Sequence, residues 1–179
     1  MYYSTNYSSP LGSLLLAGNS AGLIGVWMEG QRYFGGTVTE DVTDQSDLPV
    51  LVAAKNWLDK YFAGRKPAIS DLSLAPGGGA FRRAVWDILC GIPYGEYTTY
   101  GDIAKKMALK MGRPRMSSQA VGGAVGHNPI SIIIPCHRVV GTNGSLTGYA
   151  GGIDKKIKLL KHEGVDMSRL YVPAKGTAL

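Results

Sequence analysis

The dipeptide Cys136–His137 is the part of the sequence whose residue types most directly suggest chemistry. Thiolate is the nucleophilic form of cysteine, and a free thiol with a pKa of about 8.5 is mostly protonated at neutral pH. A neighbouring imidazole that accepts the proton activates such a nucleophile. The preceding run Ile132–Ile134 predicts a buried strand that ends at Pro135, so we expect the two side chains to meet across a turn or through a bridging water. Taken alone, the pair is more typical of a buried structural cysteine beside a core histidine.

The composition is that of a globular chain of one domain or two small ones, with 45% hydrophobic and 18% charged residues among 179. Cys90 and Cys136 do not form a CxxC motif, so we expect neither a disulfide framework nor a metal site, and we predict a structural role for Cys90. No apolar run is long enough to span a bilayer and no signal peptide is recognisable. These features predict no membrane partner and a reducing, cytoplasmic location.

Charge is divided unevenly along the chain, whose formal net charge is +6. Residues 1–79 carry five Lys or Arg and seven Asp or Glu, whereas residues 80–179 carry fourteen and six. One explanation of a basic half is simply a solvated surface that binds no charged partner. A split this uneven nevertheless favours a domain that faces a polyanion, carried by a neutral or acidic partner domain.

The N-terminal half predicts a scaffold domain over residues 1–76. Apolar stretches separated by turns predict an antiparallel sheet, with strands at 2–7, 14–17 and 23–29. A helix is expected next, with Asp47 as its N-cap, Pro49 in its first turn and Gly64 at its end. The run Ala75–Gly79 predicts the domain boundary.

The C-terminal domain, residues 77–179, begins with a predicted helix from Phe81 that ends near Gly91. Two shorter helices should follow. Thr99 is the expected N-cap of the first, with Asp102 placed as a capping-box acid, and Ser117 or Ser118 starts the second. Such a pair suggests a helix-turn-helix, and a tight hairpin turn at Asn143–Gly144 would complete a winged helix.

Gly122 and Gly123 leave the second of these helices poor in side-chain bulk. Glycine lowers helix stability, so its presence indicates that something approaches the backbone closely. A nucleic-acid backbone or a tightly packed helix would each explain it.

An amphipathic last helix is predicted from Ile153 to His162, with Ile153, Ile157 and Leu160 inward. Its lysines are expected to point mostly outward, and they are Lys155, Lys156, Lys158 and Lys161. The tail that follows has little periodicity, and we expect it to be loosely held.

Over about residues 80–165 the sequence resembles the O6-alkylguanine-DNA alkyltransferase (methylated-DNA–protein-cysteine methyltransferase) family. The matching motifs, in chain order, are Ala120–Ala124, Asn128–Pro129, Pro135–Val139, Gly148–Gly152 and Glu163–Gly164. The resemblance implies an α/β (α+β) fold: an N-terminal ribonuclease H-like domain with an antiparallel sheet plus helix, then a C-terminal winged helix-turn-helix domain. It implies DNA repair by irreversible transfer of an alkyl group, in particular methyl, from O6-alkylguanine in double-stranded DNA to Cys136 after base flipping. O4-alkylthymine is a further candidate substrate.

The resemblance also implies a monomer that reacts once, without a cofactor or metal, and it assigns roles to site residues. Cys136 would be the nucleophile, His137 the base acting through water, and Glu163 the acceptor of the other imidazole proton. Tyr100 would crowd the target phosphate and offer its hydroxyl to the base, and Asn128 would brace the turn before the active-site strand. The implied substrate-binding residues are Tyr149, Ala150, Val139 and Gly148. The implied DNA-binding residues are Gln119, Ala120, Gly122, Gly123, Arg113, Arg115 and Ser118.

One position departs from the family pattern. Gln119 occupies the place where many members carry an arginine that fills the gap left by the flipped base. Glutamine can hydrogen-bond an orphaned base but brings no charge, and Arg113 or Arg115 could compensate. We predict a structural role for Arg138, paired with an acid of the fold.

Two other functions compete with alkyl transfer. A winged-helix protein could bind alkylated DNA without catalysis, but non-catalytic relatives replace the cysteine, and Cys136 is intact. A Cys-His hydrolase would require an oxyanion hole, and no known protease signature surrounds Cys136.

Overall fold

The structure, a computed structural model, describes residues 1–36, 38 and 42–174. Its chain divides into two compact units. The first contains residues 1–78 together with 129–133, and the second contains residues 79–128 and those from 134 onward. The predicted domain boundary at residues 76 and 77 stays a prediction; the segment 129–133 belongs with the first unit although it lies far along the sequence.

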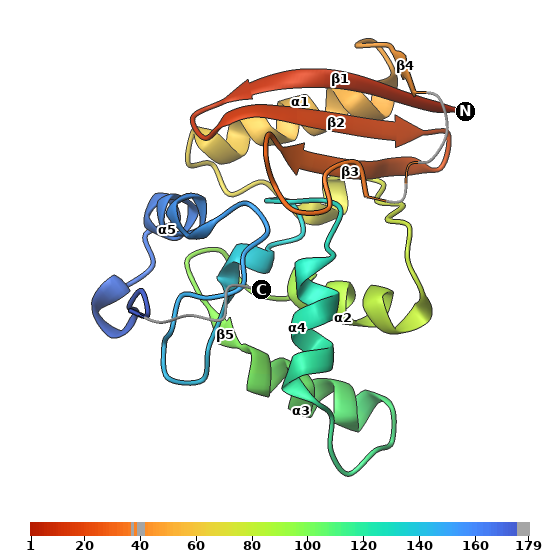
Figure 1. Cartoon of the computed structure of the whole chain (residues 1–179). Helices are drawn as coiled ribbons and strands as arrows, with labels where there is room; N and C mark the ends of the chain where they lie inside the picture. The colour runs from red at the N-terminus through yellow and green to blue at the C-terminus, as the bar shows by residue number, and fades with distance from the viewer. Residues whose placement is uncertain (37, 39–41, 175–179) are drawn as a thin grey trace. The chain divides into compact units, whose positions relative to one another are not determined.

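The first unit is built on a four-stranded sheet with the order β3-β2-β1-β4 (Figure 1). Its strands are β1 (Tyr2–Ser9), β2 (Gly12–Asn19), β3 (Gly22–Met28) and β4 (Val42–Asp44). The three predicted strands are confirmed and pair antiparallel in sequence order. The sheet also contains β4, which was not predicted and which pairs in parallel with β1. A strand of three exposed residues carries too little hydrophobic pattern to be predicted from sequence.

Helix α1 (Pro49–Phe62) packs against the sheet and forms the core of this unit with it. Its buried residues are Leu51, Ala54, Trp57, Leu58 and Tyr61. The N-cap is Leu48, which makes no side-chain cap hydrogen bond, so the prediction of Asp47 as N-cap is wrong. The helix starts one residue later than the polar residue suggests, at Pro49, whose fixed φ and missing N–H suit the first helical position.

The segment 129–133 adds to the first unit through β3. The Val26 N–H donates to the Pro129 carbonyl at 2.9 Å, and the Ser131 N–H donates to the Val26 carbonyl at 3.0 Å. The predicted strand over Ile132–Ile134 is wrong, since Ile132 has a φ of 73° and the Ile133 N–H donates to the Ser131 carbonyl. A positive φ at the centre of a hydrogen-bonded three-residue turn is the strained form of the γ-turn. The sequence predicted that this apolar run is buried, but not that it forms a turn.

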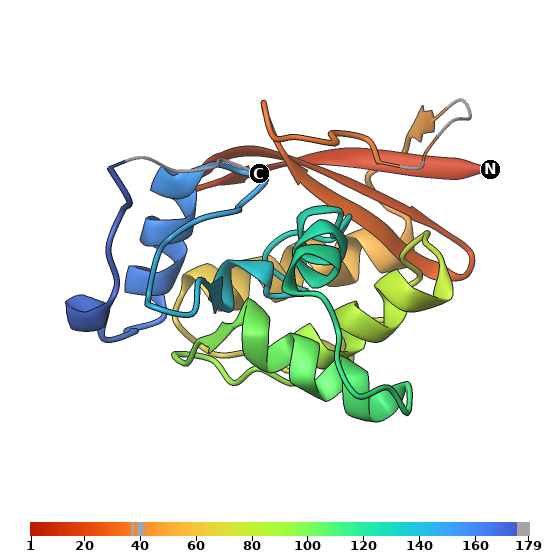
Figure 2. The ribbon, with the colours of Figure 1, turned by 60° about the horizontal axis from the view of Figure 1, so that its bottom comes forward.

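The second unit contains three helices that pack on one another, seen in yellow-green, green and teal in Figure 2. They are α2 (Ala80–Cys90), α3 (Tyr100–Lys110) and α4 (Ser118–Gly126). The predicted caps are confirmed: the Thr99 hydroxyl accepts from the Asp102 N–H, and Ser117 accepts from the Ala120 N–H. Trp86 of α2 donates its indole N–H to the Ala124 carbonyl of α4 at 2.9 Å. The helix-turn-helix pair α3–α4 is therefore present and rests on α2.

The turn at Asn143–Gly144 is present, but it does not lead into an antiparallel hairpin. Strand β6 (Val139–Val140) pairs in parallel with β5 (Thr98–Thr99), and the chain beyond the turn is held by the tail. The Leu146 N–H donates to the Tyr171 carbonyl at 2.8 Å, and the Tyr171 N–H donates to the Gly144 carbonyl at 3.1 Å. The expectation of a loosely held tail is therefore wrong as far as Tyr171; residues 175–179 lie outside the described residues.

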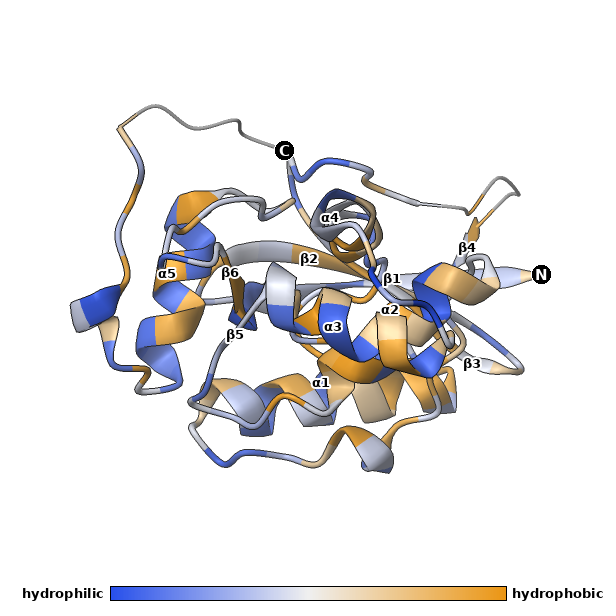
Figure 3. Cartoon of the chain, turned by 90° about the horizontal axis from the view of Figure 1, so that it is seen from below, coloured by the Kyte–Doolittle hydropathy of each residue, from blue (hydrophilic) through white to orange (hydrophobic). Residues whose placement is uncertain are grey.

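Helix α5 (Ile153–His162) shows both hydrophilic and hydrophobic stretches in Figure 3, as expected for an amphipathic helix. Its buried residues are Lys156, Leu159 and Leu160. As predicted, the lysines of this helix point mostly outward, since Lys158 and Lys161 are exposed and Lys155 is partly exposed, but Lys156 is buried. The cause is helical spacing: Lys156 lies three residues after Ile153 and four before Leu160, on the apolar face.

Candidate active site

Cys136 opens a short 3-10 helix, η2 (Cys136–Arg138), directly after a second three-residue turn. In that turn the Cys136 N–H donates to the Ile134 carbonyl at 2.8 Å across Pro135, whose φ of −82° and ψ of 63° define an inverse γ-turn. The thiol is only 5% exposed. Proline therefore turns the chain at the cysteine rather than ending a strand there.

Asn128 fixes this turn from the end of α4. Its Nδ2 donates to the Ile134 carbonyl at 2.8 Å and to the Cys136 Sγ at 3.1 Å. Asn128 is itself 4% exposed, so both bonds are buried. One amide thus holds both the backbone before the cysteine and the sulfur, as expected for a residue that braces the turn.

His137 and Glu163 form a buried hydrogen-bonded pair. The His137 Nε2 lies 2.6 Å from the Glu163 Oε1, and both side chains have no exposed surface. Arg138 donates to the same carboxylate, from Nε to Oε2 at 2.8 Å and from a terminal nitrogen to Oε1 at 3.0 Å. Its other terminal nitrogen donates to the Ile92 carbonyl. The prediction that Arg138 pairs with an acid of the fold is confirmed.

The charges of this cluster follow from burial and pairing. Burial raises the pKa of Glu163, but the hydrogen bonds from His137 and Arg138 outweigh it and leave that pKa well below its usual range. Burial lowers the pKa of His137, only partly offset by Glu163. His137 is therefore neutral beside an ionised Glu163, which requires the proton on Nε2. The Nδ1 atom is left as a buried acceptor with no hydrogen-bond partner among the described residues.

Burial also raises the pKa of the Cys136 thiol, against the lowering effects of the Asn128 hydrogen bond and the Lys156 charge. The resting thiol is therefore protonated and needs a base. The Nδ1 of His137, one residue away, is the neutral acceptor that the site offers. A buried thiol, a neutral imidazole and an ionised carboxylate are the groups that nucleophilic displacement by sulfur requires.

Lys156 is a buried charged residue near the site that the sequence predictions did not include. Its side chain is fully buried, and its Nζ donates to the Val139 carbonyl at 2.5 Å and to the Thr147 carbonyl at 2.7 Å. Burial lowers its pKa to about 8, against the opposing effect of Cys136. Its position on the apolar face of α5 is the one signal in the sequence that bears on it, and that signal does not reveal the two carbonyl partners.

Tyr100, at the first position of α3, turns its hydroxyl to the loop after the turn at Asn143–Gly144. The hydroxyl donates to the Thr147 and Gly148 carbonyls, each at 3.2 Å. Burial and the proximity of Cys136 raise the pKa of Tyr100 far above its ordinary value, so the phenol stays protonated. Tyr100 is thus a neutral donor beside the thiol.

The predicted substrate-binding residues all lie in the second unit. Val139 and Tyr149 are buried, whereas Gly148 and Ala150 are partly exposed. Burial, with the charges of Cys136 and Glu163, raises the pKa of Tyr149 well above its ordinary value, so its phenol stays protonated.

The predicted DNA-binding residues divide by exposure. Ser118, Gln119, Ala120, Arg113 and Arg115 are exposed, and Gly123 is partly exposed. Gly122 is buried, because the helical repeat turns it inward beside Val121, and its role as a DNA contact stays a prediction. A Cβ at Gly123 would meet nothing within 4 Å, which removes close helix packing as the reason for that glycine.

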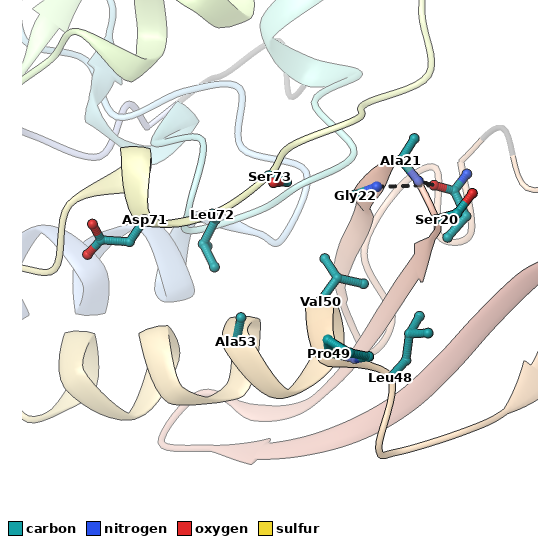
Figure 4. Close-up of a pocket in the computed structure, with 11 residues that line it drawn as sticks. Ser20, Ala21, Gly22, Leu48, Pro49, Val50, Ala53, Asp71, Leu72 and Ser73 are labelled. Carbon is teal, nitrogen blue, oxygen red and sulfur yellow. Dashed lines mark hydrogen bonds between the residues drawn. The ribbon is translucent and has the colours of Figure 1, made fainter.

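A cavity of about 420 Å³ in the first unit lies at the start of α1 (Figure 4). It is lined by residues 19–22, 48–50, 53 and 71–73. Asp71 is the only ionisable side chain among these lining residues, and they include no cysteine or histidine. The cavity therefore lacks a nucleophile and base of the kind found around Cys136.

Among residues 1–36, 38 and 42–174, no three His, Cys, Asp or Glu side chains gather in a group that could hold a metal ion. Over the same part of the chain, no helix is both long enough and apolar enough to cross a membrane.

Known proteins match both halves of the chain. The family model described as "6-O-methylguanine DNA methyltransferase, ribonuclease-like domain" matches residues 1–76, and the one described as "6-O-methylguanine DNA methyltransferase, DNA binding domain" matches residues 80–165. The α/β fold is therefore that of a two-domain class of 6-O-methylguanine DNA methyltransferases. The chain belongs to the 6-O-methylguanine DNA methyltransferase family.

Individual relatives agree. A methylated-DNA–protein-cysteine methyltransferase of Methanosarcina acetivorans is 46% identical over 165 residues, which cover 92% of this chain and 99% of the relative. One of Haemophilus influenzae is 39% identical over 91% of this chain and 87% of the relative. The crystal structure of Mycobacterium tuberculosis OGT in complex with DNA has a TM-score of 0.74 and 41% identity, and covers 97% of this chain and 95% of that one.

Proposed function

We propose that this protein repairs DNA by transferring an alkyl group from O6-alkylguanine in duplex DNA to Cys136. The observation that carries the proposal is the buried arrangement of the Cys136 sulfur on Asn128 and of the adjacent His137 on Glu163. The match over both family domains supports the same reaction. O6 of a stacked guanine is out of reach for a buried thiol, so the base must leave the stack before reaction.

The proposed reaction uses one nucleophile and one base. The His137 Nδ1 accepts the Cys136 proton through a bridging water, while the ionised Glu163 accepts a hydrogen bond from Nε2–H and stabilises the imidazolium that forms. The sulfur forms a bond to the alkyl carbon as the bond between that carbon and O6 breaks, and the electron pair of the broken bond remains on guanine. The proton that left the thiol balances this charge and finally resides on the released base. Tyr100 would donate its hydroxyl to guanine, and the carbonyls of Cys136 and Val139 would accept from its exocyclic amine.

The transfer is stoichiometric in this proposal. The sulfur of a thioether is a poor leaving group, so the alkyl group stays on Cys136. The proposed chemistry uses no second nucleophile. Each molecule therefore reacts once, and neither a cofactor nor a metal takes part in the step.

Recognition of DNA is assigned to the exposed side of α4. Ser118, Gln119 and Ala120 would enter the minor groove, and Gln119 would fill the space of the flipped base. Arg113 and Arg115 would contact phosphates, which makes binding depend on salt. The excess of basic residues in the second half of the sequence supports this assignment.

In this proposal the monomer is the active form, and it acts on DNA in the cytoplasm. Every residue assigned to the reaction comes from the second unit of one chain, so no second copy is needed to complete the site.

Titration of acceptor capacity tests the proposal. Duplex DNA with O6-[³H-methyl]guanine is mixed with increasing protein, and label bound to protein is counted. We expect transfer to stop at one equivalent per folded chain and to vanish in Cys136→Ser. Label that continues to leave the DNA beyond one equivalent, or transfer in the serine variant, would contradict the proposal.

A further inference from the structure

The Thr147 carbonyl accepts hydrogen bonds from two different elements. One donor is the Lys156 ammonium of α5, at 2.7 Å, and the other is the Tyr100 hydroxyl of α3, at 3.2 Å. Lys156 also holds the Val139 carbonyl at 2.5 Å. The fully buried Lys156 thus links Val139, the residue after η2, to the loop that leads to Tyr149.

The proposed reaction requires one of these donors to leave. Tyr100 cannot donate one proton fully to guanine and to the Thr147 and Gly148 carbonyls at the same time. When the hydroxyl turns to the base, the partly buried Thr147 carbonyl would lose one of its two donors. Loss of a hydrogen bond at a partly buried carbonyl costs free energy, so it would oppose the binding of guanine.

We propose that Lys156 is a positioning residue that keeps the Thr147 carbonyl hydrogen-bonded when the Tyr100 hydroxyl is handed over to the flipped guanine. The inference rests on the proposed function and adds a residue that the sequence predictions did not include. Lys156 touches neither the sulfur nor the base in this account. It acts by making the Tyr100 hydroxyl available to guanine while the Thr147 carbonyl in the loop keeps a hydrogen-bond donor.

The titratable groups on which the Lys156 charge acts decide how the test is designed. They are Cys136 and His137 of η2, and His137 is paired with Glu163 after α5. The charge of Lys156 affects the pKa values of both Cys136 and His137, so a change in pH would move several groups together. A comparison of variants at one fixed pH separates the hydrogen bond from these titrations.

The experiment is a double-mutant cycle with free O6-benzylguanine, which needs no DNA binding. The single-turnover rate at saturation and the half-saturating concentration are measured for the unsubstituted protein, Tyr100→Phe, Lys156→Met and the double variant. In the presence of Lys156, we expect Tyr100→Phe to raise the half-saturating concentration about tenfold, as loss of one buried hydrogen bond does. In the Lys156→Met background, the same change should cost less than about twofold, because Tyr100 must then stay on Thr147.

Controls separate this effect from loss of structure. Lys158→Met removes an exposed lysine of the same helix and should leave the Tyr100 effect intact. Lys156→Arg retains the charge and donors and should preserve most of the Tyr100 effect, which keeps the test decisive if Lys156→Met has no cooperative thermal transition. An equal cost of Tyr100→Phe in the unsubstituted protein and in the Lys156→Met background would overturn the inference, as would loss of the Tyr100 effect in a cooperatively folded Lys156→Arg. A failure of the unsubstituted protein to react would instead count against the proposed function.

Discussion

The reaction site and the proposed DNA-facing helix are built in opposite ways within the same unit. Around Cys136, charged side chains are buried and paired: Glu163 with His137 and Arg138, and Lys156 with two carbonyls. Along the start of α4, the exposed residues Ser118, Gln119 and Ala120 are uncharged and small or flexible. In the proposed function, chemistry therefore depends on a set of interior contacts, whereas recognition depends on a surface with few contacts of its own.

This difference predicts that substitutions separate into two classes. A change in the buried cluster should impair reaction with free O6-benzylguanine and with duplex DNA alike. A change on α4 should impair only the duplex reaction. The following predictions test this separation, from the largest expected effect to the smallest.

Glu163→Gln should have the largest effect, because it removes the charge that both His137 and Arg138 use. We expect the transfer rate to fall about 100-fold or more on both substrates. Loss of one partner of a buried ion pair should also lower the free energy of unfolding by about 3–5 kcal/mol. Single-turnover kinetics and chemical denaturation measure the two effects, with the exposed Asp154→Asn of α5 as control. Near-normal transfer by Glu163→Gln would show that His137 does not need the carboxylate.

Acid should destabilise the protein through the same pair. The pKa values of Glu163 and His137 are both lowered in the folded state, so the unfolded chain binds more protons than the folded one as the pH falls. Their contribution to stability is complete above the unfolded pKa of histidine, about 6.5, and is lost below it by up to about 1.4 kcal/mol per pH unit for each proton. Urea denaturation from pH 8 to pH 4 should show this fall, and Glu163→Gln should flatten the acidic part of the curve. Identical pH dependence in both proteins would contradict the assignment.

Asn128→Ala should have an intermediate effect. It leaves the Ile134 carbonyl and the Cys136 sulfur without the donor that holds them. We expect a loss of about tenfold in transfer rate on both substrates and of about 1–3 kcal/mol in stability. Asn56→Ala, an exposed position on α1, is the matched control for rate and melting temperature. A loss confined to duplex DNA would place Asn128 in recognition instead.

Gln119→Ala should impair repair of duplex DNA by about three- to tenfold, which corresponds to one neutral hydrogen bond. Reaction with free O6-benzylguanine should change by less than about twofold, since the side chain is exposed and outside the buried cluster. The ratio of the two rate constants is the measurement. Equal losses on both substrates would remove Gln119 from the extrusion of the base.

Arg113→Ala should have the smallest effect. We expect uniformly weaker duplex binding and a salt slope that is smaller by about one unit, as for one lost phosphate contact. Fluorescence anisotropy over a salt series measures the slope, and Arg65→Ala, exposed in the first unit, serves as control. An unchanged slope would show that the segment before α4 does not contact phosphate.

The elements of the second unit could largely be predicted from the sequence because their signals are local. Thr99 with Asp102 and Ser117 with Ala120 are contacts three residues apart, so the starts of α3 and α4 follow from short motifs. The candidate roles of Cys136, His137 and Glu163 came from resemblance to a family. The distances between these three side chains are set by the fold and could not be predicted from the sequence.

Other features depend on contacts between distant segments and could not be predicted. Whether Ile132 is in a strand or in a strained turn is decided by the pairing of the flanking residues with Val26. The burial of Lys156 depends on two carbonyls, of Val139 and Thr147, that its own helix does not contain. Periodicity predicts which face of a helix is inward, but not that a lysine on that face finds partners.

The most direct test of the central claim is intact-mass analysis after the protein is mixed with excess duplex DNA that contains O6-methylguanine. We predict one added CH₂ unit per chain, mapped by peptide sequencing to Cys136, with Cys90 unmodified and no adduct in Cys136→Ala. An adduct on another residue, or an unmodified protein that still binds the duplex, would contradict alkyl transfer to Cys136.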